Sequence, residues 1–231
     1  PSAAPAASTP SKSNTIAVLP FVNMSPDPEN EFFSDGITEE IINALAAIPQ
    51  LKVISRTSSF YFKNKPLPLK EIASQLDVAN ILEGSIRVAG EKVRITAQLI
   101  QAEDDFHYWS ESWNRNLENI FEIQNEISLL IAERLREQTG HFIIGDALVN
   151  KQTESLDAYA YSLKARHHFN KWNPEDVRKA VHLYEKALEL DQNHSESWLG
   201  LADAYGFLGT TESIPGDDAW KKVVDYTHKA V

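Results

Sequence analysis

With 231 residues the chain is long enough for two domains, and its 42% hydrophobic and 24% charged residues are typical of a globular protein. Its net charge of −11 comes from an acidic excess in both halves, which argues against nucleic-acid binding and against an anionic membrane surface. The absence of cysteine excludes disulfides and thiolate chemistry, but it leaves the compartment open.

The first fourteen residues, 1–14, are rich in Pro, Ala and Ser and predict a flexible linker. The sequence shows no start methionine, no signal peptide and no apolar run of membrane-spanning length. Its last residues lie inside a helical pattern. We therefore expect a fragment of a longer protein, with any membrane anchor upstream of this sequence.

The first folded segment predicts a strand, a loop and a helix. Ile16–Val22 is an apolar run interrupted by Pro20, as expected for a buried strand, and a polar loop follows at Asn23–Asn30. The helix stripe consists of Phe33, Ile37, Ile41, Leu45 and Ile48. Ser34 or Asp35 is a candidate cap, although the phase of Phe33 favours a start one turn earlier. We expect Pro49 to end this helix.

The following elements predict a mixed sheet. They are a strand at Leu51–Ser55, a loop at Arg56–Lys65, a helix at Leu69–Leu76, strands at Ala79–Val88, Lys92–Gln101 and His107–Asn114, and a helix at Glu118–Gln138 ended by Gly140. Strict alternation in Lys92–Gln101 predicts a hairpin strand with one wet face. We predict an α/β sandwich in which helices cover one mixed sheet.

The second half has a different period and predicts only helices from Leu156 onward. Two helical hairpins recur: Tyr161 and Ala165 match Trp198 and Ala202 at an offset of 37 residues. The second helix of the first hairpin places Ala180, Tyr184 and Ala187 at a small–aromatic–small spacing. The predicted second helix of the second hairpin is Ala219–Val231, after a loop at Thr210–Asp218. This pattern resembles tetratricopeptide repeats, although Gln192 stands where that family usually has a turn proline.

The first half resembles the amino-terminal domain of the TolB-like family. The segments that carry the resemblance are AVLPF, FSDGITEEI and KVISR, and the likeness covers Thr15–Gln138. It implies a binding or scaffolding module of bacterial membrane-anchored regulators, often ahead of tetratricopeptide repeats, with no catalytic residues to transfer. The predicted domains are therefore the linker 1–14, a TolB-like domain 15–142, a connector 143–155 and repeats 156–231.

The first helices of the repeats suggest a partner-binding surface. By analogy with the usual peptide site of such repeats, its candidates are Tyr161, Lys164, His168, Trp198, Leu201 and Tyr205. Trp198 and Leu201 also fit the repeat core. A weaker candidate is an anion site at Ser34, Asp35 and Gly36, where a helix start would offer free N–H groups.

Other chemistry-bearing residues have simpler explanations. His167 and His168 diverge on a helix and are poor metal ligands, and the carboxylate pairs Glu39–Glu40 and Asp104–Asp105 fit a helix start and a turn. Aromatic packing explains Trp109 and Trp113, with Phe60–Phe62, better than ligand stacking does. We predict no catalytic residue, cofactor or metal.

The sequence favours a non-catalytic sensory or scaffolding module that binds a protein or peptide and is able to self-associate. We expect it on the periplasmic side of a bacterial inner membrane, in a signalling or transcriptional regulator, held to the membrane only through an upstream anchor. Three alternatives stay open. In the first, the α/β domain is a small-ligand receptor or an enzyme. In the second, the same interaction module is cytoplasmic. In the third, the chain is the cytoplasmic regulatory region of a nucleotide cyclase.

Overall fold

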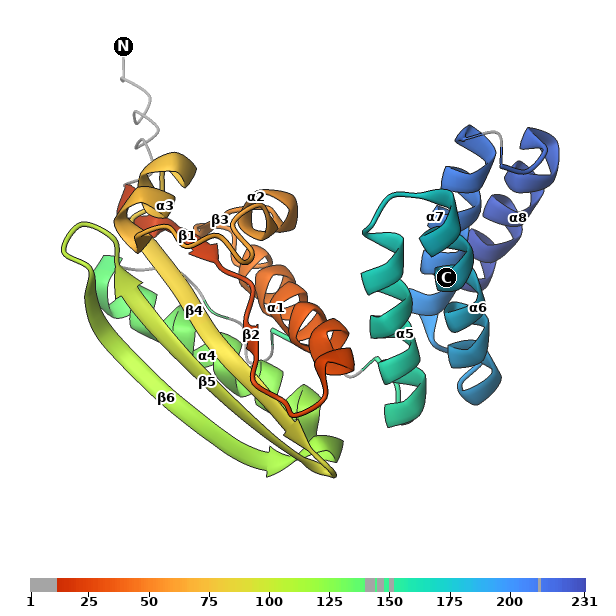
Figure 1. Ribbon diagram of the computed structural model, residues 1–231. Helices are drawn as coiled ribbons and strands as arrows, with labels where there is room; N and C mark the ends of the chain where they lie inside the picture. The colour runs from red at the N-terminus through yellow and green to blue at the C-terminus, as the bar shows by residue number, and fades with distance from the viewer. Residues whose placement is uncertain (1–11, 140–143, 145–147, 150–151, 212) are drawn as a thin grey trace, which may run out of the picture. The chain divides into compact units, whose positions relative to one another are not determined.

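The computed structural model describes residues 12–139, 144, 148–149, 152–211 and 213–231 (Figure 1). The chain divides into two compact units. The α/β unit consists of Pro1–Pro26 and Ile37–Val149, and the helical unit consists of Asp27–Gly36 and Asn150–Val231. The domain boundaries given above stay predictions. Of the predicted linker 1–14, residues 1–11 lie outside the described part, whereas Lys12–Asn14 form a 3-10 turn rather than flexible chain.

The α/β unit is built on one six-stranded mixed sheet. Its strands are β1 (Thr15–Val18), β2 (Val22–Asn23), β3 (Lys52–Val53), β4 (Asn80–Ala89), β5 (Lys92–Gln101) and β6 (Phe106–Asn116). The order is β3-β1-β4-β5-β6, and β2 also pairs with β4. β1 pairs in parallel with β3 and β4, and β2 pairs in parallel with β4, whereas β4, β5 and β6 form an antiparallel meander. The predicted mixed sheet is confirmed.

The strand predicted at Ile16–Val22 is broken in two. Proline has no N–H to give to a ladder, so pairing stops between β1 and β2, at Pro20. The main-chain N–H of Phe21 donates instead to the Thr38 hydroxyl at 3.0 Å. Three residues lie between Val18 and Val22, but only two lie between their partners Leu82 and Ser85 on β4, so the chain bulges here.

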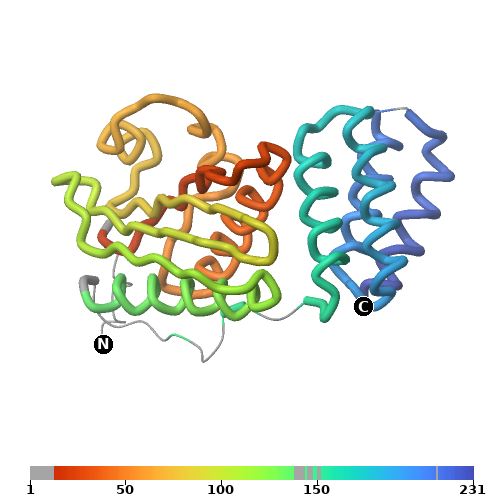
Figure 2. The backbone as a smooth tube through the Cα atoms, turned by 60° about the horizontal axis from the view of Figure 1, so that its bottom comes forward, coloured from red at the N-terminus to blue at the C-terminus, as the bar shows by residue number. Residues whose placement is uncertain are grey.

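Four helices belong to the α/β fold. They are α1 (Glu31–Ala46), α2 (Arg56–Phe60), α3 (Leu69–Leu76) and α4 (Ile120–Thr139). Ile37, Ile41 and Leu45 of α1 are fully buried, as its stripe predicts. Figures 1 and 2 show α4 along one face of β4, β5 and β6. α3 packs against Ala17 and Ile81. The prediction of helices covering one mixed sheet is confirmed.

Several predicted ends were wrong by a turn or less. α1 ends at Ala46 rather than at Pro49, because a proline disfavours the helical conformation of the residue before it. The segment Arg56–Lys65 is not all loop, because Ser55 caps the short helix α2 by accepting a hydrogen bond from the Ser58 N–H. The predicted stop at Gly140 lies outside the described residues.

The antiparallel meander of β4, β5 and β6 has one buried face and one face that is largely exposed to solvent. On β5, Val93, Ile95, Ala97 and Leu99 are buried, as predicted. On the other face, cross-strand rungs join polar residues of all three strands, such as Ser85, Thr96 and Ser112. The Thr96 and Ser112 hydroxyls are hydrogen-bonded at 2.9 Å. This polar face carries the cationic site discussed below.

The helical unit consists of two antiparallel hairpins. Its helices are α5 (Leu156–Phe169), α6 (Pro174–Leu190), α7 (Ser195–Thr210) and α8 (Gly216–Lys229). The described part of the chain after Leu156 contains no strand, as predicted. α8 begins at Gly216 instead of Ala219, and α7 extends through Thr210, so the predicted loop between them is too long.

Small residues allow the helices of the hairpins to approach closely. Ala165, Ala180 and Ala202 are buried together with the Tyr184 ring. A Cβ on Gly200 would collide with that ring, so the aromatic side chain fills the space that the glycine leaves. This is the packing that the small–aromatic–small spacing predicted.

Candidate functional site

The anion site proposed at Ser34, Asp35 and Gly36 is corrected by the position of the helix start. α1 begins at Glu31, immediately after a 3-10 turn at Pro28–Asn30. Ser34–Gly36 therefore lie in the second turn of the helix, where N–H groups bond to carbonyls four residues earlier. The free N–H groups on which that hypothesis depended are not at these residues.

Half of the predicted partner surface lies in or against the core of the second hairpin. Leu201 is 1% exposed. The half-buried Trp198 and Tyr205 rings pack against Tyr226 of α8, at centroid distances of 5.5 and 5.7 Å. The Trp198 indole N–H also donates to the main-chain oxygen of Gln192 at 2.9 Å. The buried Leu201 belongs to the core, as the sequence also allowed, whereas a role of the half-buried Trp198 and Tyr205 in partner binding stays a prediction.

His168 also has a structural role. Its Nδ1 lies 2.7 Å from the Asp176 carboxylate, which accepts a further hydrogen bond from the Asn173 side chain. Asn173 in turn caps α6 by accepting from the Asp176 N–H. These hydrogen bonds hold the pKa of Asp176 well below its usual range. His168 thus ties the end of α5 to the start of α6.

The two other predicted surface residues, Tyr161 and Lys164, are half-buried on α5. The Lys186 ammonium lies 5.7 Å from the centre of the Tyr161 ring, at cation–π distance. Their role in partner binding stays a prediction.

Three aromatic side chains that the sequence did not single out form an exposed cluster, which we call the aromatic trio: Phe169, Trp172 and Phe207. The Trp172 ring packs against Phe169 in a tilted arrangement at a centroid distance of 5.2 Å, and against Phe207 edge-on at 5.7 Å. Phe169 and Phe207 are anchored in the core by Val177, Ala204 and Leu208. Trp172 itself is 62% exposed. A large apolar ring is thus held on the surface by a rigid base.

The backbone of Trp172 is in the left-handed region, with φ 52°. Trp172 is the second residue after Asn170, the C-cap of α5, and directly precedes Asn173, the cap of α6. For a bulky residue the left-handed conformation costs about 1–2 kcal/mol. The trio therefore combines strain with exposure, and neither property is visible in the apolar periodicity of the sequence.

Other candidate residues have structural partners. Trp109 and Trp113 are buried side by side on β6, with ring centroids 5.8 Å apart, which supports the packing explanation. Glu39 forms an ion pair with Arg56 at 2.9 Å. Among the residues that the structure describes, no three His, Cys, Asp or Glu side chains are grouped so as to hold a metal ion. None of the described helices combines the length and the apolarity needed to span a bilayer.

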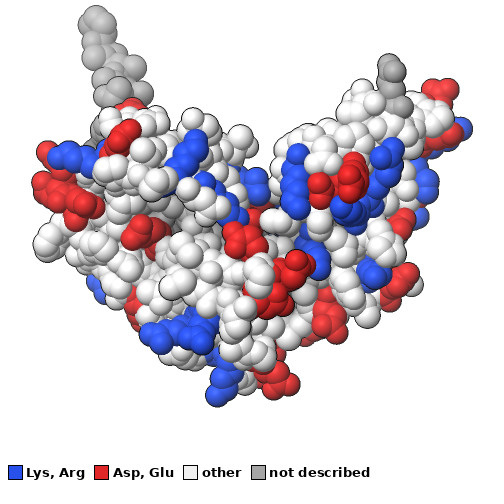
Figure 3. Space-filling model, viewed as in Figure 1, with Lys and Arg blue, Asp and Glu red and all other residues white. Residues whose placement is uncertain are grey.

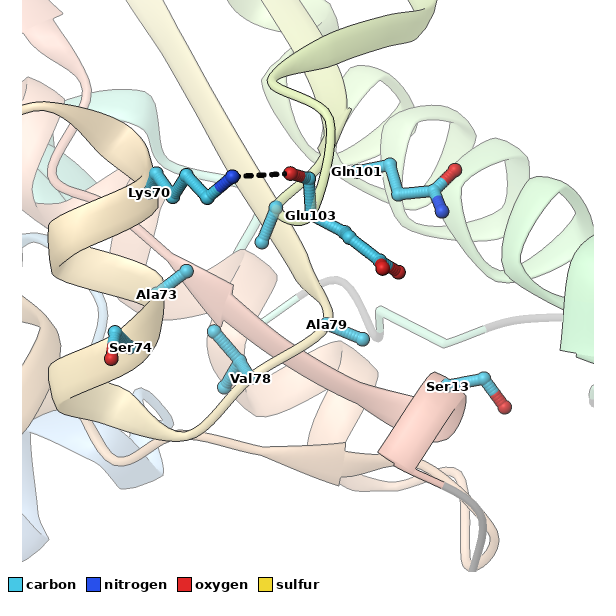
Figure 4. Close-up of a pocket in the computed structure, with 9 residues that line it drawn as sticks. Ser13, Lys70, Ala73, Ser74, Val78, Ala79, Gln101 and Glu103 are labelled. Atoms are coloured by element: carbon cyan, nitrogen blue, oxygen red, sulfur yellow. Dashed lines mark hydrogen bonds between the residues drawn. The ribbon is translucent and has the colours of Figure 1, made fainter.

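A pocket of about 430 Å³ lies in the α/β unit (Figure 4). It is bounded by α3, the start of β4 and the turn between β5 and β6. Lys70 donates to the main-chain oxygen of Glu103 at 3.0 Å, whereas Ser13 and Gln101 lie apart from this pair in Figure 4. Since the Lys70 ammonium is held by a backbone carbonyl, the polar groups that line this pocket do not point to a common position where a substrate could react.

A buried Ser–His pair occurs at the start of α7. His194 Nδ1 lies 2.7 Å from the Ser197 hydroxyl, and both side chains are 0% exposed, so no substrate reaches them. His194 Nε2 has no hydrogen-bond partner in the described structure. Burial lowers the pKa of His194, nearby Asp191 opposes that effect, and Arg166 adds to it. Asp191 accepts a hydrogen bond from Thr153, which links the connector to the α6–α7 turn.

We expect the helical unit to lose stability in mild acid because of His194. The unfolded chain binds the proton near the ordinary pKa of 6.5, whereas the folded state resists it. Stabilisation is therefore complete above this pH and falls as the pH drops towards the lowered pKa, by at most about 1.4 kcal/mol per pH unit. Denaturant titrations of His194→Gln should show a flatter pH profile than the wild type. His182→Gln, an exposed control on α6, should keep the wild-type slope.

Comparison with known proteins identifies one family in part of the chain. The model of the family "Tetratricopeptide repeat" matches residues 183–214, from the end of α6 through α7. A protein of Rhizobium meliloti (strain 1021) named "Putative adenylate cyclase 3" is 38% identical over 182 residues. The match covers 77% of this chain but only 30% of that protein.

Similar solved structures include TolB from Acinetobacter baumannii, lipoprotein GNA1162 from Neisseria meningitidis and the LpoB C-terminal domain from Escherichia coli. For TolB the identity is 18%, the TM-score is 0.41, and the match covers 57% of this chain and 29% of that one. For the lipoprotein the identity is 15%, the TM-score is 0.38, and the match covers 54% of this chain and 96% of that one. For the LpoB domain the identity is 18%, the TM-score is 0.36, and the match covers 44% of this chain and 82% of that one. Likenesses this distant bear on neither a site nor a partner.

The predicted combination of an α/β domain, built on one mixed sheet, with tetratricopeptide repeats is confirmed as a description of the chain. The class of protein is therefore one that combines a tetratricopeptide repeat with an α/β domain.

Proposed function

We propose that this chain is a non-catalytic protein-interaction and sensory module, and that its helical unit binds a protein or peptide partner at the aromatic trio. The tetratricopeptide match supports the interaction role. The choice of site rests on Trp172, whose side chain is exposed, whose backbone is strained and whose ring packs against the anchored rings of Phe169 and Phe207.

The backbone of Trp172 is strained although its side chain stays 62% exposed, so burial offsets little of the strain. A left-handed tryptophan costs stability, and strained residues persist at functional sites where the surrounding structure determines them. Exposed tryptophans on rigid bases are favourable binding anchors, because they lose little conformational entropy when a partner covers them. The partner should therefore present an apolar side chain that covers the indole ring.

Replacing Trp172 by asparagine should separate binding from folding. Asparagine tolerates the left-handed conformation, so the melting temperature should stay within a few degrees of the wild-type value. A peptide selected from a displayed library against the whole chain, and then titrated by calorimetry, should bind Trp172→Asn about thirtyfold more weakly, which corresponds to a loss of about 2 kcal/mol.

The matched control is Trp220→Asn, because Trp220 is 67% exposed on α8 but has ordinary helical geometry. This variant should bind the selected peptide with wild-type affinity. Equal losses in both variants would mean that the peptide recognises any exposed indole, and unchanged binding in Trp172→Asn would exclude the trio as the site.

At the level of the whole protein, we propose that the chain is the periplasmic part of a bacterial membrane-anchored signalling or transcriptional regulator. Partner binding would then change the orientation or self-association of the anchored protein. Support comes from the TolB-like resemblance of Thr15–Gln138 in the sequence. Fusing a reporter that is active only in the periplasm to the full-length protein tests the side of the membrane.

The similarity to a protein named as an adenylate cyclase favours one alternative, in which the chain is a cytoplasmic regulatory region of a nucleotide cyclase. An inactive periplasmic reporter, together with an active cytoplasmic one, would select this alternative. In either compartment the chain supplies the interaction region, and any catalytic output belongs to the rest of the parent protein.

A further inference from the structure

Four cationic side chains gather where β4 turns into β5. Arg87, Lys92, Arg94 and Arg115 line a pocket of about 330 Å³ together with Asn114 and Asn116. In the view of Figure 3, Lys and Arg side chains cluster at the lower end of the sheet, where Figure 1 shows this hairpin. The net charge of the chain is −11, so the local excess of positive charge runs against the overall composition.

The strand register sets the geometry of this site. Arg87 of β4 is directly opposite Arg94 of β5, and Arg94 is opposite Asn114 of β6. All three are exposed on the wet face of the meander. Residues opposite one another in an antiparallel pair have Cβ atoms about 4.5–5.5 Å apart, and like charges at this distance destabilise the sheet.

Three of the four cations in this pocket have no acidic partner among the described residues. Arg87, Lys92 and Arg94 form no ion pair within that part of the chain. Arg115 has one acidic partner, Glu126, at the long distance of 3.9 Å and with both side chains nearly half exposed. An isolated pair of arginines on neighbouring strands is therefore left to attract an external anion.

We propose that this pocket binds the phosphate group of a small phosphorylated ligand, held between Arg87 and Arg94. Each guanidinium offers parallel N–H donors that match two oxygens of a phosphate. Lys92 adds a third positive charge, and the Asn114 amide adds neutral donors from the next strand. The volume is at the lower end of the range for small-molecule sites, which suits a compact phosphomonoester.

This site is on the α/β unit and is independent of the proposed partner surface on the helical unit. The proposal of phosphate binding and the proposal of partner binding at the aromatic trio can therefore be tested separately. Trp172→Asn should leave phosphate binding unchanged, and loss of phosphate binding should leave the selected peptide bound.

The test uses the full chain, with inorganic phosphate and glycerol 3-phosphate as probes at constant ionic strength. Both should raise the melting temperature of the wild type and bind in calorimetry. Arg94→Gln should weaken binding at least about tenfold, as expected for the loss of one charge-assisted partner. Without phosphate, this variant should melt at or above the wild-type temperature, because a repulsion has been removed.

Lys52→Gln provides the control, since Lys52 is an exposed cation of the same sheet on β3. It should bind phosphate like the wild type. An equal loss in Lys52→Gln and Arg94→Gln would show non-specific screening and overturn the proposal, as would a melting temperature of Arg94→Gln well below that of the wild type.

Vesicles containing phosphatidic acid distinguish the source of the phosphate. Vesicle binding that is lost in Arg94→Gln, together with weak binding of both soluble probes, assigns the same phosphate chemistry to a lipid headgroup. Binding of neither the soluble probes nor the vesicles contradicts the site.

Discussion

Gly84→Ala is expected to destabilise the α/β unit by about 3 kcal/mol or more, at the upper end of overpacking effects. A Cβ at this position would collide with the main-chain oxygen of Thr96 and lie 2.6 Å from a ring atom of Phe21. The Phe21 ring is 1% exposed and the Thr96 oxygen belongs to the sheet backbone, so neither yields without disturbing its surroundings. Chemical denaturation followed by circular dichroism measures the loss.

The control for this experiment is Gly216→Ala at the start of α8. A Cβ there meets no atom within 4 Å, and alanine is the better helix former, so stability should be unchanged or slightly higher. If Gly84→Ala melted like the wild type, the close packing of Phe21 on β4 would be wrong.

Ile41→Asp is expected to unfold the α/β unit. Ile41 is 0% exposed in the middle of α1. Burial in an apolar site raises the pKa of a carboxyl group by several units, and holding it ionised at neutral pH costs about 4 kcal/mol or more. The lost apolar contacts add to this cost, and the sum is comparable with the whole stability of a typical domain.

Asn43→Asp introduces the same charge on the exposed side of the same helix and should change stability by less than about 0.5 kcal/mol. The defect of Ile41→Asp should also shrink in acid, since a protonated carboxyl is cheaper to bury. A wild-type melting curve for Ile41→Asp would show that the core-facing stripe of α1 is misassigned.

The sequence predicted the regular elements of the fold well where periodicity and turn residues agree. Lys92–Gln101 and Leu69–Leu76 have the same bounds in the structure as in the prediction. The sequence did not predict the short helix α2, because one Ser55 cap supports a five-residue helix that is too short to show a period. Nor did it predict the exact limits of the first strand around Pro20.

The candidate sites were harder to predict because periodicity shows which residues are apolar but not which helix covers them. Leu201 lies in the core of the second hairpin, and Trp198 and Tyr205 pack partly buried against that core, next to α8. The backbone angle of Trp172 has no signature in the sequence. The pairing of Arg87 with Arg94 did have a signature in the sequence, because the tight turn at Gly90, with φ 61°, fixes the strand register that brings the two arginines together.

The hydrogen bond from Thr153 to Asp191 has a mechanical consequence for the connector. Ser155, two residues further on, caps α5, so the end of the connector is attached both to the first hairpin and to the turn that opens the second. A pull along the connector is therefore shared between two hairpins and does not load α5 alone. Tension along the connector would therefore act between the start of α5 and the α6–α7 turn.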